Sequence, residues 1–283
     1  MTIRVVTPFP PWFRDPACHP VRAHIPKYRA RHGGLGSTRR FFMAYVHVIA
    51  NQKGGVGKTT VTVNLAAVVA DTMGGTPDDT PVLGVSTDPQ ASMLEWATRA
   101  GDALPFDFEQ CSDNPELLSK LKRIKKYTHI FVDTPGSLDK EEILRVVLEQ
   151  ADDVIIPIEP EPLAFSPAAR SIEKVIKPFG KPWRVLINNW DPRDGEADLE
   201  QTKGYVAAKR FPRFNTVIRH YKLHTRASAE GMTVVQYPKN RVALEARQDF
   251  FKLALEVLGG SSDGVPKHAS DGGNGVSTPA GDR

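Results

Sequence analysis

The glycine-rich segment of this chain reads Asn51-Gln52-Lys53-Gly54-Gly55-Val56-Gly57-Lys58-Thr59-Thr60. It follows the apolar run 45–50 and precedes a helical pattern of apolar residues that begins at Val61. A strand, a glycine-rich loop and a helix in this order are typical of a phosphate-binding loop. Glycines let backbone N–H groups approach phosphate oxygens, and the helix N-terminus adds the positive end of its dipole. The segment therefore predicts a nucleotide site.

Two side chains at the end of this loop have separate expected roles. Lys58 would place a positive charge on the outer phosphates, and the Thr59 hydroxyl would ligate Mg²⁺. The loop departs from the general P-loop pattern, because Gln52 occupies the first glycine position and Lys53 adds a second lysine. The nucleotide-binding residues that we expect in this segment are Lys53, Gly54, Gly55, Val56, Gly57, Lys58, Thr59 and Thr60.

This lysine-glycine core resembles the deviant Walker A box of the ParA/MinD family of dimeric ATPases. In that family the extra lysine, here Lys53, reaches across a dimer interface to the nucleotide of the partner. The resemblance implies ATP and Mg²⁺ as cofactors and a homodimer that forms when ATP binds. It covers residues 45 to about 258, which is most of the chain.

A second segment resembles the Walker A′ box of the same family. The apolar run 81–87 ends in Asp88-Pro89-Gln90, and the family aspartate at this position orients the attacking water. Two residues depart from the family pattern. Ser86 stands where an acid is common, and Ala91 stands where glycine is usual.

A third segment, 129–136, matches Walker B, because an apolar strand ends in Asp133 and a turn. Asp133 would hold Mg²⁺ through water, since Mg²⁺ keeps much of its hydration shell and takes few carboxylates. The resemblance therefore implies a catalytic group of Lys53, Lys58, Asp88 and Asp133, with Thr59 and Asp133 at the metal.

Apolar strands alternate with amphipathic helices along the rest of the chain. Helical patterns span 140–150 and 167–176, and buried strands are expected at 153–158 and 183–187. We predict a doubly wound α/β fold, a P-loop NTPase with a mainly parallel sheet and helices on both faces. Ligands bind at the carboxyl ends of such strands. Asn188 follows one of them and resembles the family residue that bonds adenine, although an ordinary turn residue is the open alternative.

Positive charge is concentrated late in the chain. From Lys203 to Arg226 there are seven cations and no acid, which indicates phosphate binding. Segments 215–219 and 237–241 resemble family segments associated with sequence-independent DNA binding. We expect non-specific double-stranded DNA to contact Arg219, Lys222, Arg226 and Arg241. Arg219 and Lys222 are alternatives for the same DNA-binding position of the family. Scattered surface cations are the alternative.

The two ends differ in composition from the centre. Residues 1–42 carry eight basic residues against the single acid Asp15, together with six prolines. We expect a flexible basic extension, which is either a DNA-binding arm or lies upstream of a true start at Met43. Residues 259–283 are rich in glycine and serine and are expected to form a disordered tail. The predicted ATPase domain is therefore 43–258.

The chain offers little support for a membrane or secreted protein. It has two cysteines, Cys18 and Cys111, and no apolar run long enough to span a bilayer. The last predicted helix, 242–258, carries Leu244, Phe251 and Leu255 with Leu258 on one face, and its charges sum to −1. We expect this face to pack in the core rather than on anionic lipid, and we expect a cytoplasmic, nucleoid-associated protein.

These observations favour a ParA-like ATPase that partitions a plasmid, phage genome or chromosome. Its partner would be a ParB-like centromere-binding protein bound to the cargo. The main alternative is a ParA-like positioning ATPase for a non-DNA cargo such as a protein compartment. A MinD-like protein and an ATP-dependent synthetase of the same fold are less favoured. A metal-cluster carrier would need cysteines after Asp133, and the sequence has none there.

Overall fold

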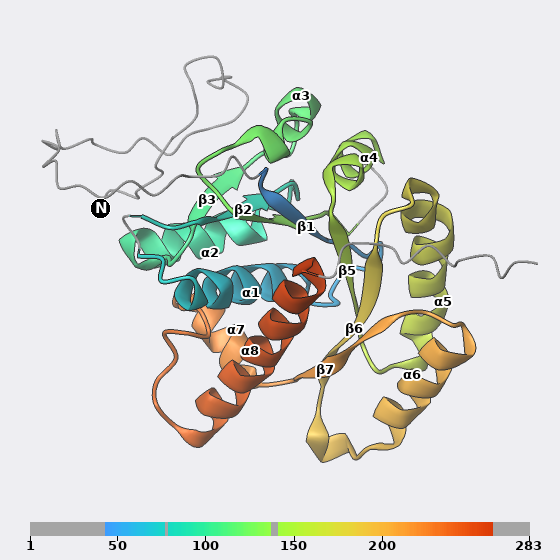
Figure 1. Cartoon of the computed structure of the whole chain (residues 1–283). Helices are drawn as coiled ribbons and strands as arrows, with labels where there is room; N and C mark the ends of the chain where they lie inside the picture. The colour runs from blue at the N-terminus through green and yellow to red at the C-terminus, as the bar shows by residue number, and fades with distance from the viewer. Residues whose placement is uncertain (1–42, 77–78, 137–140, 263–283) are drawn as a thin grey trace, which may run out of the picture.

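The centre of the structure is a seven-stranded sheet in which all paired strands are parallel (Figure 1). The computed structural model describes residues 43–76, 79–136 and 141–262. The predicted basic extension 1–42 and residues 263–283 of the predicted tail 259–283 lie outside these residues. The first four residues of that tail, 259–262, are helical rather than disordered. The strands are β1 (Tyr45–Ile49), β2 (Val82–Ser86), β3 (Asp107–Gln110), β4 (His129–Asp133), β5 (Asp153–Ile158), β6 (Trp183–Trp190) and β7 (Arg213–Arg219). Their order across the sheet is β3-β2-β4-β1-β5-β6-β7.

Helices cover both faces of this sheet. They are α1 (Lys58–Thr72), α2 (Ser92–Ala100), α3 (Pro115–Leu118), α4 (Glu141–Gln150), α5 (Pro162–Ser171), α6 (Ala197–Ala208), α7 (Lys222–Ala229) and α8 (Arg241–Ser262). One core cluster joins α1, α2, α7 and α8 to the sheet, and a second joins α3, α4, α5 and α6 to the other face. The predicted doubly wound α/β fold is confirmed.

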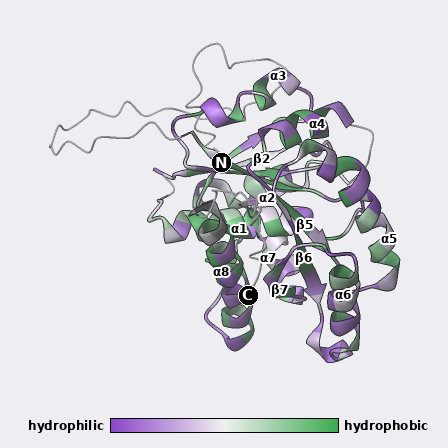
Figure 2. Cartoon of the chain, turned by 45° about the vertical axis from the view of Figure 1, so that its right-hand side comes forward, coloured by the Kyte–Doolittle hydropathy of each residue, from purple (hydrophilic) through white to green (hydrophobic). Residues whose placement is uncertain are grey.

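The burial of the helices follows their sequence patterns. Helix α1 is buried on nearly every side, from Val61 to Ala70, because it lies between the sheet and α8. The outer helices α5, α6 and α8 carry both hydrophilic and hydrophobic residues (Figure 2). An amphipathic helix is stable at a surface because its apolar stripe is buried against the core.

The strand register places three strand ends at one edge. Ile49 of β1 and Ser86 of β2 both pair with Asp133 of β4. The Thr134 hydroxyl donates to the carbonyl of Ile49 at 2.8 Å and the Thr87 hydroxyl to that of Asp133 at 2.9 Å. The segments that follow β1, β2 and β4 therefore start side by side.

Some element boundaries differ from the sequence-based expectation. β3 was not predicted, because its four residues, Asp107–Gln110, lack a clear apolar pattern. β6 continues to Trp190, so Asn188 belongs to the strand rather than to the turn after it. Helix α5 begins at Pro162, which suits a first turn because proline lacks the N–H that would be unpaired there. The predicted start at Pro167 was therefore five residues late.

The last helix packs in the core, but with a different face from the one expected. The buried stripe of α8 is Ala243, Ala246, Phe250, Leu253, Ala254 and Val257. Leu244 and Leu255 are 56% and 67% exposed, and Phe251 and Leu258 are only partly buried. The alanines explain the choice, since small side chains let α8 approach the alanine-rich surface of α1 closely. The prediction that Leu244 and Leu255 face the core was wrong.

The edge strand β7 contains an irregularity that one carboxylate stabilises. Its pairing with β6 shifts register between Arg213 and Val217. At this point Glu256 of α8 accepts hydrogen bonds from the backbone N–H groups of Asn215, at 2.8 Å, and Thr216, at 2.7 Å. It also accepts from the Thr216 hydroxyl at 2.5 Å. Glu256 thus satisfies donors that the irregular strand leaves unpaired.

We predict that Glu256→Ala lowers the free energy of unfolding by about 1–3 kcal/mol, because it leaves these donors without an acceptor. Glu256→Gln keeps one acceptor oxygen and should cost less. Denaturant unfolding of the two variants measures the difference. Glu149→Ala is the control, because Glu149 only pairs with exposed Arg145 on α4. Equal losses in the Glu256 and Glu149 alanine variants would contradict the role given to Glu256.

Candidate functional site

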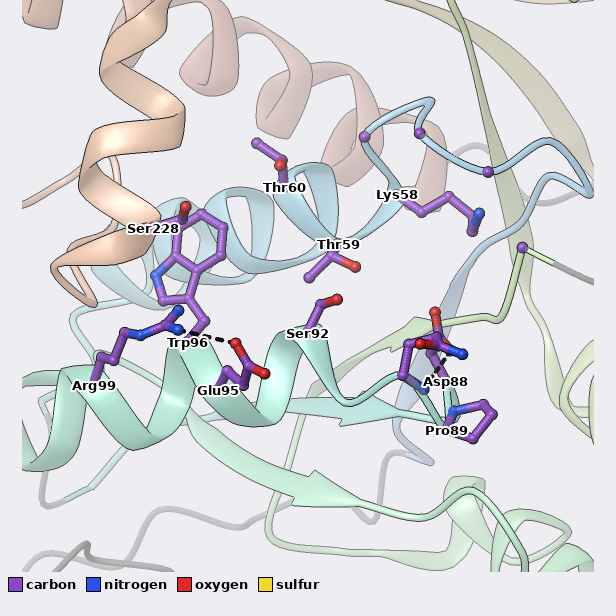
Figure 3. Close-up of a pocket in the computed structure, with 15 residues that line it drawn as sticks. Lys58, Thr59, Thr60, Asp88, Pro89, Ser92, Glu95, Trp96, Arg99 and Ser228 are labelled. Carbon is purple, nitrogen blue, oxygen red and sulfur yellow. Dashed lines mark hydrogen bonds and ion pairs between the residues drawn. The ribbon is translucent and has the colours of Figure 1, made fainter.

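An open cavity of about 770 Å³ lies at the carboxyl edge of the sheet (Figure 3). Its walls come from the glycine-rich loop, the start of α1, the turn after β2, and helices α2 and α7. Predicted site residues that line it are Gly54, Gly55, Gly57, Lys58, Thr59, Thr60 and Asp88. The cavity thus brings together most of the residues that the sequence assigned to ATP. Lys53, Val56, Asp133 and Asn188 lie outside its lining.

The conformation of the loop requires glycine at two positions. Gly55 and Gly57 have φ angles of 81° and 80°, in the left-handed region that other residues rarely adopt. Gly57 also has no room for a side chain, because a Cβ there would lie 2.4 Å from Nδ2 of Asn188. That same Nδ2 donates to the carbonyl of Val56 at 2.8 Å. Asn188 therefore braces the loop from β6, a role that the sequence analysis did not foresee.

The bond between Asn188 and Val56 limits the predicted contact between Asn188 and adenine. Asn188 is buried, and the carbonyl of Val56 occupies one of the two N–H donors on its Nδ2. The second N–H and the acceptor Oδ1 would be left for a base. The contact with adenine remains a prediction.

Lys58 is the buried cation of the site. Its side chain leaves the first turn of α1, and Nζ donates to the carbonyl of Lys53 at 3.3 Å. Burial lowers the pKa of Lys58, while the negative charges of Asp133 and Asp88 oppose this shift. An ammonium group held in this way needs an anion nearby, and a bound polyphosphate would supply one.

Asp133 and Thr59 form the part of the site that suits a cation. The Thr59 hydroxyl donates to Oδ2 of Asp133 at 2.7 Å. Burial raises the pKa of Asp133 to about 7, although the hydrogen bond from Thr59 and the charge of Lys58 act in the opposite direction. Oδ1 of Asp133 and Oγ of Ser86 are buried and have no hydrogen-bond partner among the described residues. Buried polar atoms without partners indicate a missing ligand or water. The residues present therefore fit hydrated Mg²⁺ beside Thr59.

The turn after β2 holds Asp88 at the cavity. Oδ1 of Asp88 accepts from the backbone N–H of Gln90 at 2.9 Å, and Gln110 of β3 donates to its carbonyl at 3.0 Å. Ala91, which stands where the family usually has glycine, has φ 59° and ψ 19°. This left-handed conformation costs about 1–2 kcal/mol for a residue other than glycine. The departure at Ala91 thus leaves the turn intact but strained.

Lys53 points away from the cavity that Lys58 enters. Its Nζ lies 2.9 Å from Oε2 of Glu159 and 3.5 Å from Oε2 of Glu161. These two acids follow β5, and the sequence analysis did not single them out. Their signal was position alone, since acids directly after a parallel strand fall at the ligand-binding edge of the sheet.

The four residues expected at DNA lie in different surroundings. Lys222 and Arg226 are exposed one turn apart on α7, and no acid lies within ion-pair distance of either in the described part of the chain. Arg241 is 91% exposed and pairs with Glu245 at 2.9 Å. Arg219 instead packs against α8, where its guanidinium contacts Asp249 at 2.8 Å. Of these four residues, the two on α7 are therefore the ones that combine exposure with no ion pair to an acid among the described residues.

Comparison with known families agrees with this geometry. The profile of the CobQ/CobB/MinD/ParA nucleotide binding domain matches residues 47–234. The chain belongs to this family. The match includes all three boxes of the sequence analysis, so the ParA/MinD resemblance of the sequence is confirmed. This member of the family contains no helix, among the residues described, that has the length and apolarity to cross a membrane.

Two curated relatives in the family carry the same name. "Maintenance of carboxysome distribution protein A" of Gloeobacter kilaueensis is 38% identical over 217 residues, which cover 76% of this chain and 95% of the relative. The protein of that name from Halothiobacillus neapolitanus is 29% identical, over 68% of this chain and 88% of the relative. A solved structure, the septum site-determining protein MinD from Pyrococcus horikoshii complexed with Mg-ADP, superposes with a TM-score of 0.57. It is 23% identical and covers 79% of this chain and all of that chain, and it shows the shared fold.

We predict that Gly57→Ala lowers the free energy of unfolding by about 2–4 kcal/mol, because it adds left-handed strain and a clash with Asn188. Thermal or urea unfolding without nucleotide measures this loss. Gly54→Ala is the matched control, since a Cβ at Gly54 would meet no atom within 4 Å. If both variants unfolded alike, the contact between Asn188 and the loop would not constrain position 57.

Proposed function

We propose that this protein is an ATP-dependent positioning ATPase that dimerises, binds non-specific DNA and distributes a protein compartment along it. The observation that carries the proposal is the 38% identity to a carboxysome distribution protein, which is matched over 95% of that relative's length. This favours the alternative of the sequence analysis over partition of a plasmid or chromosome. The cargo in this proposal is a bacterial protein compartment, and the activating partner is a protein bound to that cargo in place of a ParB-like centromere-binding protein.

The site geometry supports ATP and Mg²⁺ as the ligands of this cycle. The left-handed loop glycines leave backbone N–H groups free to approach phosphates, and Lys58 supplies a buried charge beside them. Thr59 and Asp133 would hold Mg²⁺, whose positive charge would stabilise the negative charge of the phosphates. Asp88, held by its turn at the same cavity, would orient the attacking water.

The exposed charges support a DNA surface without base readout. Lys222 and Arg226 project from one face of α7, and Arg241 begins the neighbouring helix α8. Phosphate contacts of this kind position a protein on a duplex but carry no sequence information. Two such faces in an ATP-bound dimer would bind DNA more tightly than one, which would couple nucleotide state to DNA attachment.

For DNA, we predict that Lys222→Ala and Arg226→Ala each weaken ATP-dependent binding to any duplex. Each lost phosphate contact should reduce the slope of log affinity against log salt by about 0.9. Fluorescence anisotropy with two unrelated duplexes, across a salt series, measures the slope. Arg145→Ala on α4, on the opposite face of the sheet, is the control. Arg219→Ala should mainly lower the free energy of unfolding rather than act directly on DNA, because it leaves Asp249 buried without its ion pair. Unchanged slopes in both α7 variants would place the DNA surface elsewhere.

For the cargo, we predict that deleting the gene makes protein compartments cluster in the cell, while a co-resident plasmid is inherited normally. The expectation follows from a cargo that diffuses and aggregates once the ATPase no longer distributes it. Fluorescence microscopy of a tagged shell protein and a plasmid-loss assay measure the two outcomes. Plasmid loss with evenly spaced compartments would reverse the assignment and restore DNA partition.

A further inference from the structure

The acids that hold Lys53 belong to its own subunit. Its side chain is 26% exposed, and that of Glu159 is 14% exposed, so this ion pair is largely shielded from solvent. Glu161 is more open, at 61%, and its contact is longer. Partial burial works against the charge of Lys53, but the hydrogen bonds and charges of Glu159 and Glu161 raise its pKa above the ordinary value. Glu159 is therefore the main partner.

The carboxylate of Glu159 is fixed on its other side as well. Its Oε1 accepts from Nδ2 of Asn189 at 3.1 Å, and Oδ1 of Asn189 lies 2.5 Å from Nδ1 of His220. Asn189 has φ 66°, a left-handed conformation that asparagine tolerates better than most residues. Each oxygen of Glu159 thus has its own partner, and Lys53 meets an acceptor that is already oriented.

The backbone of Lys53 is tied to the same strand end. Its N–H donates to Oδ1 of Asn51 at 3.0 Å, and Nδ2 of Asn51 donates to the carbonyl of Pro157 in β5 at 2.8 Å. Both the main chain and the side chain of Lys53 are therefore held at the end of β5. Lys58, five residues later, faces the cavity instead.

We infer that Glu159 is a positioning residue that retains Lys53 within its own subunit until a second subunit presents its nucleotide. This inference rests on the proposed ATP-dependent dimer. Lys53 would then exchange one carboxylate for the more highly charged phosphates of the partner's nucleotide. Glu159 competes with those phosphates for the ammonium group of Lys53. This competition would raise the ATP concentration at which the dimer forms. A partly exposed ion pair contributes only a modest free energy, so the competition should change the ATP concentration needed for dimerisation a few-fold.

The first test measures the restraint in the nucleotide-free monomer of the full chain. Acetylation by a water-soluble, amine-reactive reagent is followed by mass spectrometry. The acetylation rate of each lysine reports how accessible its amino group is. Glu159→Gln should raise the acetylation rate of Lys53 several-fold and leave that of Lys177 unchanged. Glu173→Gln should do the reverse, because Glu173 holds Lys177 in a surface pair at 2.7 Å. An unchanged rate at Lys53 in Glu159→Gln would overturn the inference.

The second test measures the competition by the ATP concentration at half-maximal dimerisation, in analytical ultracentrifugation. Glu159→Gln should lower this concentration about two- to five-fold, with ADP affinity and the unfolding temperature unchanged. Glu173→Gln should match wild type. An equal or higher ATP requirement in Glu159→Gln would overturn the inference, since Glu159 would then not compete for Lys53. Wild-type protein that stays monomeric with ATP would instead contradict the proposed function, whatever the acetylation result.

Discussion

The hydrogen bond between Thr59 and Asp133 joins the two parts of the fold on which the site depends. It connects the first turn of α1 to the end of β4, at the edge where β1, β2 and β4 finish in register. Asp133 is fully buried there, so a charged carboxylate needs Thr59, Lys58 and a cation around it. The loop between β1 and α1 must therefore bring a hydroxyl and an ammonium group to one point. The buried helix α1 and the central strand β1 hold that loop from both ends.

This constraint explains why the boxes around the nucleotide could be predicted from sequence. Gly55, Gly57 and Lys58 lie within one short glycine-rich motif, and Asp133 ends an apolar run. Each can therefore be recognised from its neighbours in the sequence and from the resemblance to the family boxes. The role of Asn188 was not visible in this way. Its contact with Val56 crosses from β6 to a loop 132 positions earlier, and only the packed sheet creates it. The acids that hold Lys53 were missed for the same reason.

Packing also decided points that the sequence pattern alone predicted wrongly or left open. Helix α8 is apolar on two faces, and the alanines on one of them allowed close contact with α1, so Leu244 and Leu255 remained outside. In the basic segment, a run of cations without a neighbouring acid suggested a uniform DNA surface. The fold instead turned Arg219 toward Asp249, an acid thirty positions away, and left Lys222 and Arg226 exposed. The number of basic residues in a segment thus overestimates the positive charge that is exposed for a partner to bind.

The two lysines of the loop have different surroundings, as the proposed dimer would require. Lys58 follows Gly57, whose left-handed backbone turns the chain into α1 and directs the side chain into the cavity. Lys53 precedes the turn and remains beside β5, where Glu159 lies. An ammonium group that is already paired gains little from leaving unless the new partner carries more charge. In the proposed dimer, a nucleoside triphosphate and its metal on a second subunit would meet that condition better than a surface carboxylate. The position of Lys53 outside the cavity of its own subunit supports this proposal.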